Sequence, residues 1–163
     1  MVIDEVDQLV LDWRRERPDL AFEDLHILSR ISRLSRRLEL ARKDAWRSLG
    51  LEAWEFDVLA ALRRSGPPFE LSPGELLKAT LVTSGTMTNR IDRMERRALV
   101  RRLPDREDGR VIRVRLTGTG MDLADRALEA LLERERDLLA SLGGNAERDI
   151  LTRLLRRLLI PLG

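Results

Sequence analysis

The stretch from Thr83 to Thr117 most constrains the fold of this chain, because its periodicity changes partway along. Apolar residues first recur at the spacing of one helical face, at Met87, Ile91, Met94 and Leu99. From Val111 to Leu116, branched apolar residues alternate with arginines, which is typical of a half-exposed strand. Asp105–Gly109 supplies a charged turn before that strand. The stretch therefore predicts a helix, capped by Thr83 or Ser84, that leads into a β-hairpin.

The same stretch concentrates positive charge. Between Arg90 and Arg115 there are ten arginines and five acidic residues, a net charge of +5. The whole chain carries only +2, so the rest of it carries −3. Basic residues gathered on one helix and one hairpin are the footprint expected of a nucleic-acid-binding element.

Helical periodicity accounts for most of the remaining chain. One helix is predicted from an N-cap at Ser72, with Glu75 three residues on as its capping-box partner, to near Thr80. Others are predicted over Val2–Arg17, from Asp19 or Glu23 to Gly50, over Trp54–Arg64, and in two leucine-rich segments separated by Gly143-Gly144-Asn145. The last of these, Ile150–Leu162, has leucines on more than one face. A surface helix cannot bury that many alone, so the segment predicts an intertwined dimer.

These patterns predict a mainly α fold class with a small β-hairpin. The architecture is a winged helix-turn-helix with N- and C-terminal dimerisation helices. The N-terminal helices occupy residues 1–50, the winged helix-turn-helix residues 51–117 and the C-terminal dimerisation helices residues 118–163, in one compact protomer.

Composition argues against other classes of protein. The chain has no cysteine and one histidine, and the sequence shows no glycine-rich phosphate loop and no histidine beside a carboxylate pair. It therefore predicts no enzyme, no cofactor and no metal site. No apolar run approaches the ~18–20 residues that span a bilayer. The first residues do not form a signal peptide pattern, and the expected location is the cytoplasm.

The helix that begins near Ser84 has a polar face suited to the major groove. Opposite the apolar stripe lie Ser84, Thr86, Asn89, Arg90 and Arg93. Asparagine can read adenine and arginine can read guanine, each through two hydrogen bonds. The alternative for these residues is an ordinary solvated helix face.

Several motifs resemble the MarR (multiple antibiotic resistance regulator) family over nearly the full chain. They are FDVLAALRRSGPP, LSPGELLKATLVTSGTMTNRIDRMERRALVRR, PDREDGRVIRVRLTGTG and the leucine-rich C-terminus. The most specific is Asp105-x-x-Asp108-x-Arg110. The resemblance implies that Arg110, held by Asp108, enters the minor groove, with Arg106 as a second backbone contact. The alternative is a plain β-turn, and Gly109 stands where many relatives carry a basic residue.

The chain also resembles the urate-responsive, PecS-like branch of that family. WRRERPDL in an added first helix, Phe56-Asp57 and Asn89-Arg90-Ile91 carry this resemblance. It implies a ligand site at four matching positions, Trp13, Asp57, Arg90 and Arg102. A planar anionic purine can stack on Trp13 and accept charge-assisted hydrogen bonds from the arginines.

Blander readings of these residues stay open. Trp13 can be an aromatic of the dimer core, Asp57 a charge near a helix N-terminus, and Arg102 one more arginine of the wing. Trp46 and Trp54 have no match in the branch and are interpreted as packing residues.

The expected function is that of a homodimeric, ligand-responsive DNA-binding transcription regulator. We expect a repressor that urate or a related purine releases from a near-palindromic operator on double-stranded DNA. The alternatives are a regulator that responds to phenolic or other aromatic acids and a ligand-blind DNA-binding protein of the same fold.

Overall fold

The computed structural model describes residues 3–80, 84–105, 109 and 111–162. The chain divides into two compact units, Met1–Asp44 and Ala45–Gly163, and the division falls inside α2 (Leu25–Arg47). None of the described helices is long and apolar enough to cross a membrane.

The first unit consists of α1 (Glu5–Glu16) and most of α2. Asp4 caps α1 by accepting hydrogen bonds from the amides of Val6 and Asp7. Val6 and Val10 pack with Phe22 in a small core. Arg30 of α2 donates to Asp4 and Asp7, at 2.8 Å in each case, and holds the pKa of Asp4 at about 2. Apolar packing and ion pairs together hold α1 to α2.

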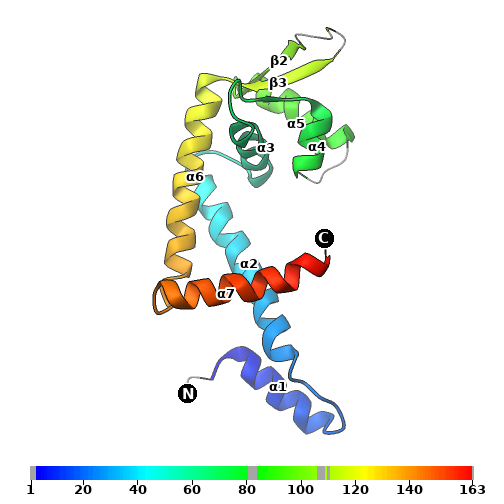
Figure 1. The fold of residues 1–163 in the computed structure, drawn as a ribbon, viewed down its shortest axis with the longest axis vertical. Coiled ribbons are helices and arrows are strands. Elements are labelled where there is room, and N and C mark those ends of the chain that lie inside the picture. The colour runs from blue at the N-terminus through cyan, green and yellow to red at the C-terminus, as the bar shows by residue number, and fades with distance from the viewer. Residues whose placement is uncertain (1–2, 81–83, 106–108, 110, 163) are drawn as a thin grey trace. The chain divides into compact units, whose positions relative to one another are not determined.

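The second unit contains the predicted helix-and-hairpin centre (Figure 1). Its elements are α3 (Ala53–Arg64), β1 (Glu70–Leu71), α4 (Pro73–Thr80), α5 (Ser84–Arg96), β2 (Val100–Pro104) and β3 (Ile112–Leu116). The strands form an antiparallel sheet in the order β1-β3-β2, with Arg102 opposite Val114. The mainly α class with a small hairpin is confirmed. The third strand, β1, was not predicted, because two residues are too few to show alternation.

One apolar core holds these elements together. The predicted stripe of α5 is confirmed, since Met87, Ile91 and Met94 are each 1% exposed or less. They pack in the same cluster as Leu59 of α3 and Val114 of β3. The predicted capping box of α4 is also present, with Ser72 and Glu75 exchanging hydrogen bonds at 2.7 and 3.2 Å. The core therefore orients α5 with its polar face outward.

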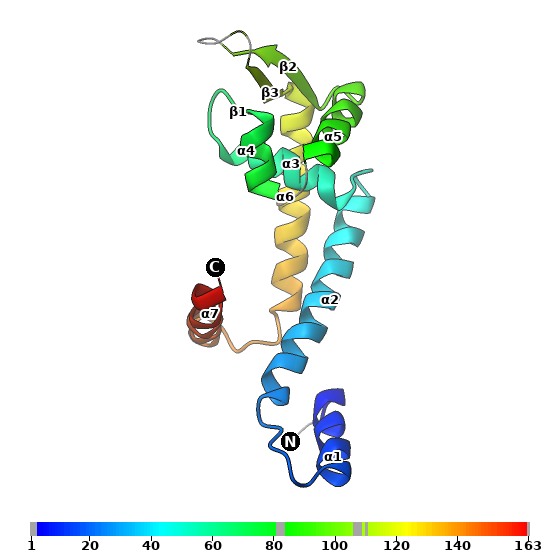
Figure 2. The same ribbon diagram turned by 90° about the vertical axis from the view of Figure 1, so that its right-hand side faces the viewer.

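Two longer helices follow the sheet, α6 (Gly118–Leu138) and α7 (Asn145–Leu159), and a 3₁₀ turn follows α7 (Ile160–Leu162). In the second unit, α3 lies between α4 and α6 (Figure 2). One face of α6 is buried at Ala124 and Ala127, whereas no described residue of α7 is buried. The leucines of α7 instead stay exposed, for example Leu154 at 50% and Leu158 at 48%.

The start of α6 approaches the backbone near β2 so closely that only glycine fits at Gly120. A Cβ there would overlap the carbonyl oxygen of Leu99, whereas a Cβ at Gly118 would meet nothing within 4 Å. We expect Gly120→Ala to destabilise the protein by about 1–3 kcal/mol, the cost of forcing extra atoms into a packed site. Gly118→Ala, the matched control, should be close to neutral. Urea unfolding measures both, and equal midpoints would contradict the close approach.

Candidate nucleic-acid interface

α5 carries most of the residues predicted to read DNA. Ser84 begins the helix, and Thr86, Asn89 and Arg93 are exposed on the side away from its buried stripe. Arg90 is half-buried. A helix that is anchored on one face and polar on the other can lie in a major groove with its N-terminal residues against base edges.

The two arginines of this face are held against the start of α3. The Arg93 guanidinium lies 4.8 Å and that of Arg90 5.2 Å from the centre of the Trp54 ring. Arg93 Nη2 also donates to Glu52 Oε1 at 2.7 Å, and Trp54 Nε1 donates to Glu52 Oε2 at 2.6 Å. Trp54 is thus more than the packing residue that the sequence indicated. Trp46, in contrast, is buried and stacks on Phe56 at 4.5 Å.

A second contact, in which the carboxylate is buried and the arginine is 40% exposed, ties the residue after α5 to α3. Arg97 Nη1 donates to both carboxylate oxygens of Glu55, at 2.6 and 2.7 Å, and Arg97 Nη2 donates to the carbonyl oxygen of Gly50 at 3.0 Å. Glu55 is only 1% exposed and also accepts from the amide of Glu52, which closes the capping box of α3. A carboxylate so enclosed requires its cationic partner.

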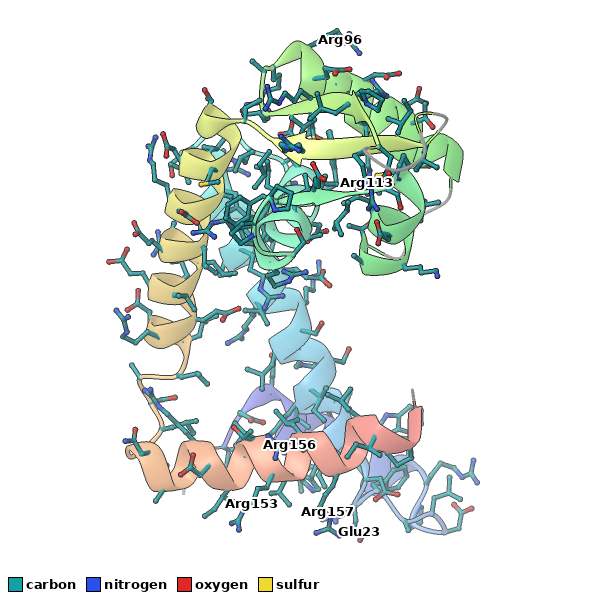
Figure 3. The ribbon with its side chains drawn as sticks, turned by 45° about the horizontal axis from the view of Figure 1, so that its top comes forward. Glu23, Arg96, Arg113, Arg153, Arg156 and Arg157 are labelled. Carbon is teal, nitrogen blue, oxygen red and sulfur yellow. The ribbon has the colours of Figure 1, made fainter. Side chains whose placement is uncertain are left out.

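Most arginines of the hairpin strands are also paired. Arg102 donates to Glu95 and Asp92 of α5, and Arg115 donates to Glu70 of β1 at 2.7 Å. Arg113 of β3 (labelled in Figure 3) donates to Asp105 at 2.6 Å and to Glu75 of α4 at 2.9 Å. These pairs fix the hairpin against α4 and α5. The predicted wing-tip residues, Arg106, Asp108 and Arg110, lie outside the described residues.

Two arginines that the sequence did not single out keep their charge available. Within the described ranges, Arg96 and Arg101 form no ion pair. Arg101 is exposed on β2, and Arg96 projects outward from the last turn of α5 (Figure 3). Both are suited to phosphate contacts. Counting charges along the chain could not find them, because only the fold shows which arginines have acidic partners.

A family profile described as "MarR family" matches residues 49–111. The chain is 38% identical to the HTH-type transcriptional regulator PecS of Dickeya dadantii over 136 residues, 83% of this chain and 82% of that protein. It is 34% identical to the HTH-type transcriptional repressor NicR of Pseudomonas putida over 109 residues, 67% of this chain and 66% of that protein.

The chain belongs to the MarR family.

The predicted resemblance, including its PecS-like branch, is thereby confirmed. Solved MarR-family structures agree. A variant of MarR from E. coli complexed with operator DNA matches with a TM-score of 0.69 at 25% identity, over 86% of this chain and 99% of that one. Bordetella bronchiseptica BpsR matches with a TM-score of 0.67 at 26% identity, over 82% and 93% of the two chains. The protein is a winged-helix, DNA-binding transcription regulator of this family.

The four residues predicted for the ligand site fall in both units of this MarR-family chain. Trp13 belongs to the first unit, where it is 47% exposed and stacks on Phe22 at 6.3 Å. The other three belong to the second unit. Asp57 is exposed on α3, three residues after Trp54, and Arg90 lies over the Trp54 ring. Arg102 is bound to Asp92 and Glu95. Across the described ranges, no group of three or more histidine or carboxylate side chains is placed to hold a metal ion.

The stability of the protein should depend on the cation that Arg97 supplies to the buried Glu55 carboxylate. Arg97→Ala should destabilise the protein by about 1–3 kcal/mol, because it leaves the buried Glu55 carboxylate without its cation while Arg97 itself is 40% exposed. The control is Arg93→Ala, whose ion pair with Glu52 has both side chains more than half exposed. Its loss should cost less than about 1 kcal/mol. Urea unfolding of both variants measures the difference, and similar losses would show that burial of Glu55 does not set the cost.

Proposed function

We propose that this MarR-family regulator is a homodimeric repressor of a near-palindromic operator. The observation that carries the proposal is α5, a helix anchored by its buried stripe and presenting Thr86, Asn89 and arginines outward. A two-fold dimer presents two such helices, so half-sites about one helical turn apart are expected. The similarity to NicR, which is named a repressor, and to MarR complexed with operator DNA supports this proposal.

Exposed apolar side chains support the homodimer. Leu128 and Leu132 of α6 are 43% and 50% exposed, and Leu154 and Leu158 of α7 are 50% and 48% exposed. Apolar residues gathered on the surface in this way mark protein–protein interfaces. A second copy of the chain would remove these leucines from water on both partners.

We further propose that an aromatic anion releases the protein from DNA, with urate as the first candidate and a related purine as the second. The four ligand positions, Trp13, Asp57, Arg90 and Arg102, support it through their match to the PecS-like branch. Arg90 links the site to DNA reading, because it lies on α5 and beside Trp54. For release, the ligand must bind the DNA-free state more tightly than the DNA-bound state.

Aromatic acids are the second candidate class of effector. BpsR, which resembles this chain over 82% of its length, is described as regulated in DNA binding by 6-hydroxynicotinic acid. A small aromatic carboxylate presents the same chemistry to a tryptophan and two arginines: a flat ring to stack and an anion to bind.

The test of the effector is a mobility-shift titration on duplex DNA from upstream of the protein's own gene. Urate, other purines and aromatic acids are added to the wild type and to Asp57→Ala. We expect urate to weaken operator binding by roughly 5–150-fold in the wild type and much less in Asp57→Ala. Release by aromatic acids alone would select the second class, identical curves would remove Asp57 from the response, and no release by either class would leave a ligand-blind regulator.

DNA reading is tested by separating base contacts from phosphate contacts. Asn89→Ala should lower discrimination at one base pair per half-site by about 1–3 kcal/mol. Arg110→Ala should instead weaken binding to all sequences and reduce the salt slope by about 1 per subunit. Binding of both variants at several salt concentrations, on operator and on scrambled duplex, distinguishes the two effects. If both variants bound like the wild type, the roles assigned to α5 and the wing would be wrong.

A further inference from the structure

Glu52 and Trp54 together with Arg90 and Arg93 form a cluster that we call the α3–α5 clamp. Both oxygens of the Glu52 carboxylate are engaged, one by the Trp54 indole N–H at 2.6 Å and one by Arg93 Nη2 at 2.7 Å. These hydrogen bonds, from Trp54 first and Arg93 second, lower the pKa of Glu52, so the carboxylate is charged at neutral pH. The clamp is therefore a charge-assisted contact between the residue before α3 and the middle of α5.

The sequence spacing explains why two arginines share one ring. Arg90 and Arg93 are three residues apart on α5 and so lie on one face of that helix. Both guanidinium groups lie within about 6 Å of the Trp54 ring centre, the range of a cation–π contact. Two cations this close repel each other, and the Glu52 carboxylate offsets that repulsion.

This arrangement competes with DNA. An arginine that reads guanine uses two N–H groups toward the base, whereas Arg93 commits Nη2 to Glu52 and stacks its guanidinium on Trp54. The contact is open to exchange, because the Arg93 and Glu52 side chains are 51% and 57% exposed. A phosphate or a base edge can therefore take the place of the carboxylate.

We propose that Glu52 and Trp54 are positioning residues that hold Arg93, and with it Arg90, against α3 in the DNA-free protein, and that DNA must take Arg93 from Glu52. The proposal rests on DNA reading by α5. Its consequence is a cost on DNA binding: every duplex that engages Arg93 must first open the clamp. Glu52 thus weakens binding to the operator and to unrelated DNA alike.

The test compares full-length wild type with Glu52→Gln on the upstream duplex and on a scrambled duplex of equal length. Glutamine keeps the size of the side chain and removes its charge. We expect Glu52→Gln to bind both duplexes more tightly, by up to about fivefold per subunit, the range of an exposed ion pair. The salt slope should steepen by about 1 per subunit, because Arg93 becomes available to phosphate. Weaker or unchanged binding to scrambled DNA would overturn the proposal.

A matched control separates the clamp from a general loss of negative charge. Asp125→Asn removes the same charge and also frees an arginine of α3, since Asp125 pairs with Arg63 at 2.8 Å. It should leave both affinities unchanged within about twofold. In an Arg93→Ala background Glu52→Gln should have no further effect, because Glu52 acts through that arginine. An equal gain from Asp125→Asn, or a persistent gain without Arg93, would contradict the mechanism.

A measurement without DNA keeps the proposal separate from the proposed function. In nitrogen-15 NMR spectra of the DNA-free protein, the Trp54 indole N–H signal should shift on Glu52→Gln and on Arg93→Ala, and stay in place on Asp125→Asn. If the chemical shift of the Trp54 indole N–H were the same in the wild type and in all three variants, the proposed clamp would be wrong. If the wild type bound no duplex at all, the repressor proposal would fail, and the indole signals alone would then decide whether the clamp exists.

Discussion

One ion pair joins α5, the helix proposed to read DNA, to the rest of the winged helix: the Glu55 carboxylate is buried, and its partner Arg97 is 40% exposed. Glu55 is 1% exposed, and it satisfies both the guanidinium of Arg97 and the amide of Glu52 at the start of α3. Arg97 in turn reaches the carbonyl oxygen of Gly50. Because a buried carboxylate without its cation is costly, α5 cannot pivot away from α3 without exposing the pair. The orientation of α5 is therefore set before DNA arrives.

Around this permanent contact lies a layer of contacts that can exchange. The Glu52–Arg93 pair is more than half exposed, and Arg90 rests on the same Trp54 ring. The Glu55–Arg97 pair fixes the position of α5. The Glu52–Arg93 pair instead fixes the direction of an arginine side chain on α5. Such a division suits a regulator of the MarR family, because the scaffold can remain intact while the arginines that we propose to contact DNA change partners.

The sequence predicted features that depend on local spacing. The stripe of Met87, Ile91 and Met94 and the capping box of Ser72 and Glu75 follow from helical geometry, and the structure confirms both. The short strand β1 could not be predicted, because its pairing with β3 is set by tertiary packing rather than by its own two residues. The acidic partners of the arginines could not be predicted either, because they are distant in the sequence. Arg93 and Glu52 are 41 residues apart, and Arg113 and Glu75 are 38 residues apart. A net charge of +5 between Arg90 and Arg115 marks a basic region, but could not show that most of its described arginines have acidic or aromatic partners.

Hydrogen exchange of the DNA-free wild type tests the central claim most directly. If the Glu55–Arg97 pair and the apolar stripe join α5 to α3, the amides of the two helices should open together. The amides to compare are those between Met87 and Met94 in α5 and between Val58 and Leu62 in α3. Their opening free energies should then agree within about 1 kcal/mol, as for one cooperative unit. Rapid exchange of α5 through a separate, low-energy opening, with α3 still protected, would contradict the claim that the DNA-reading helix is held in place before it meets DNA.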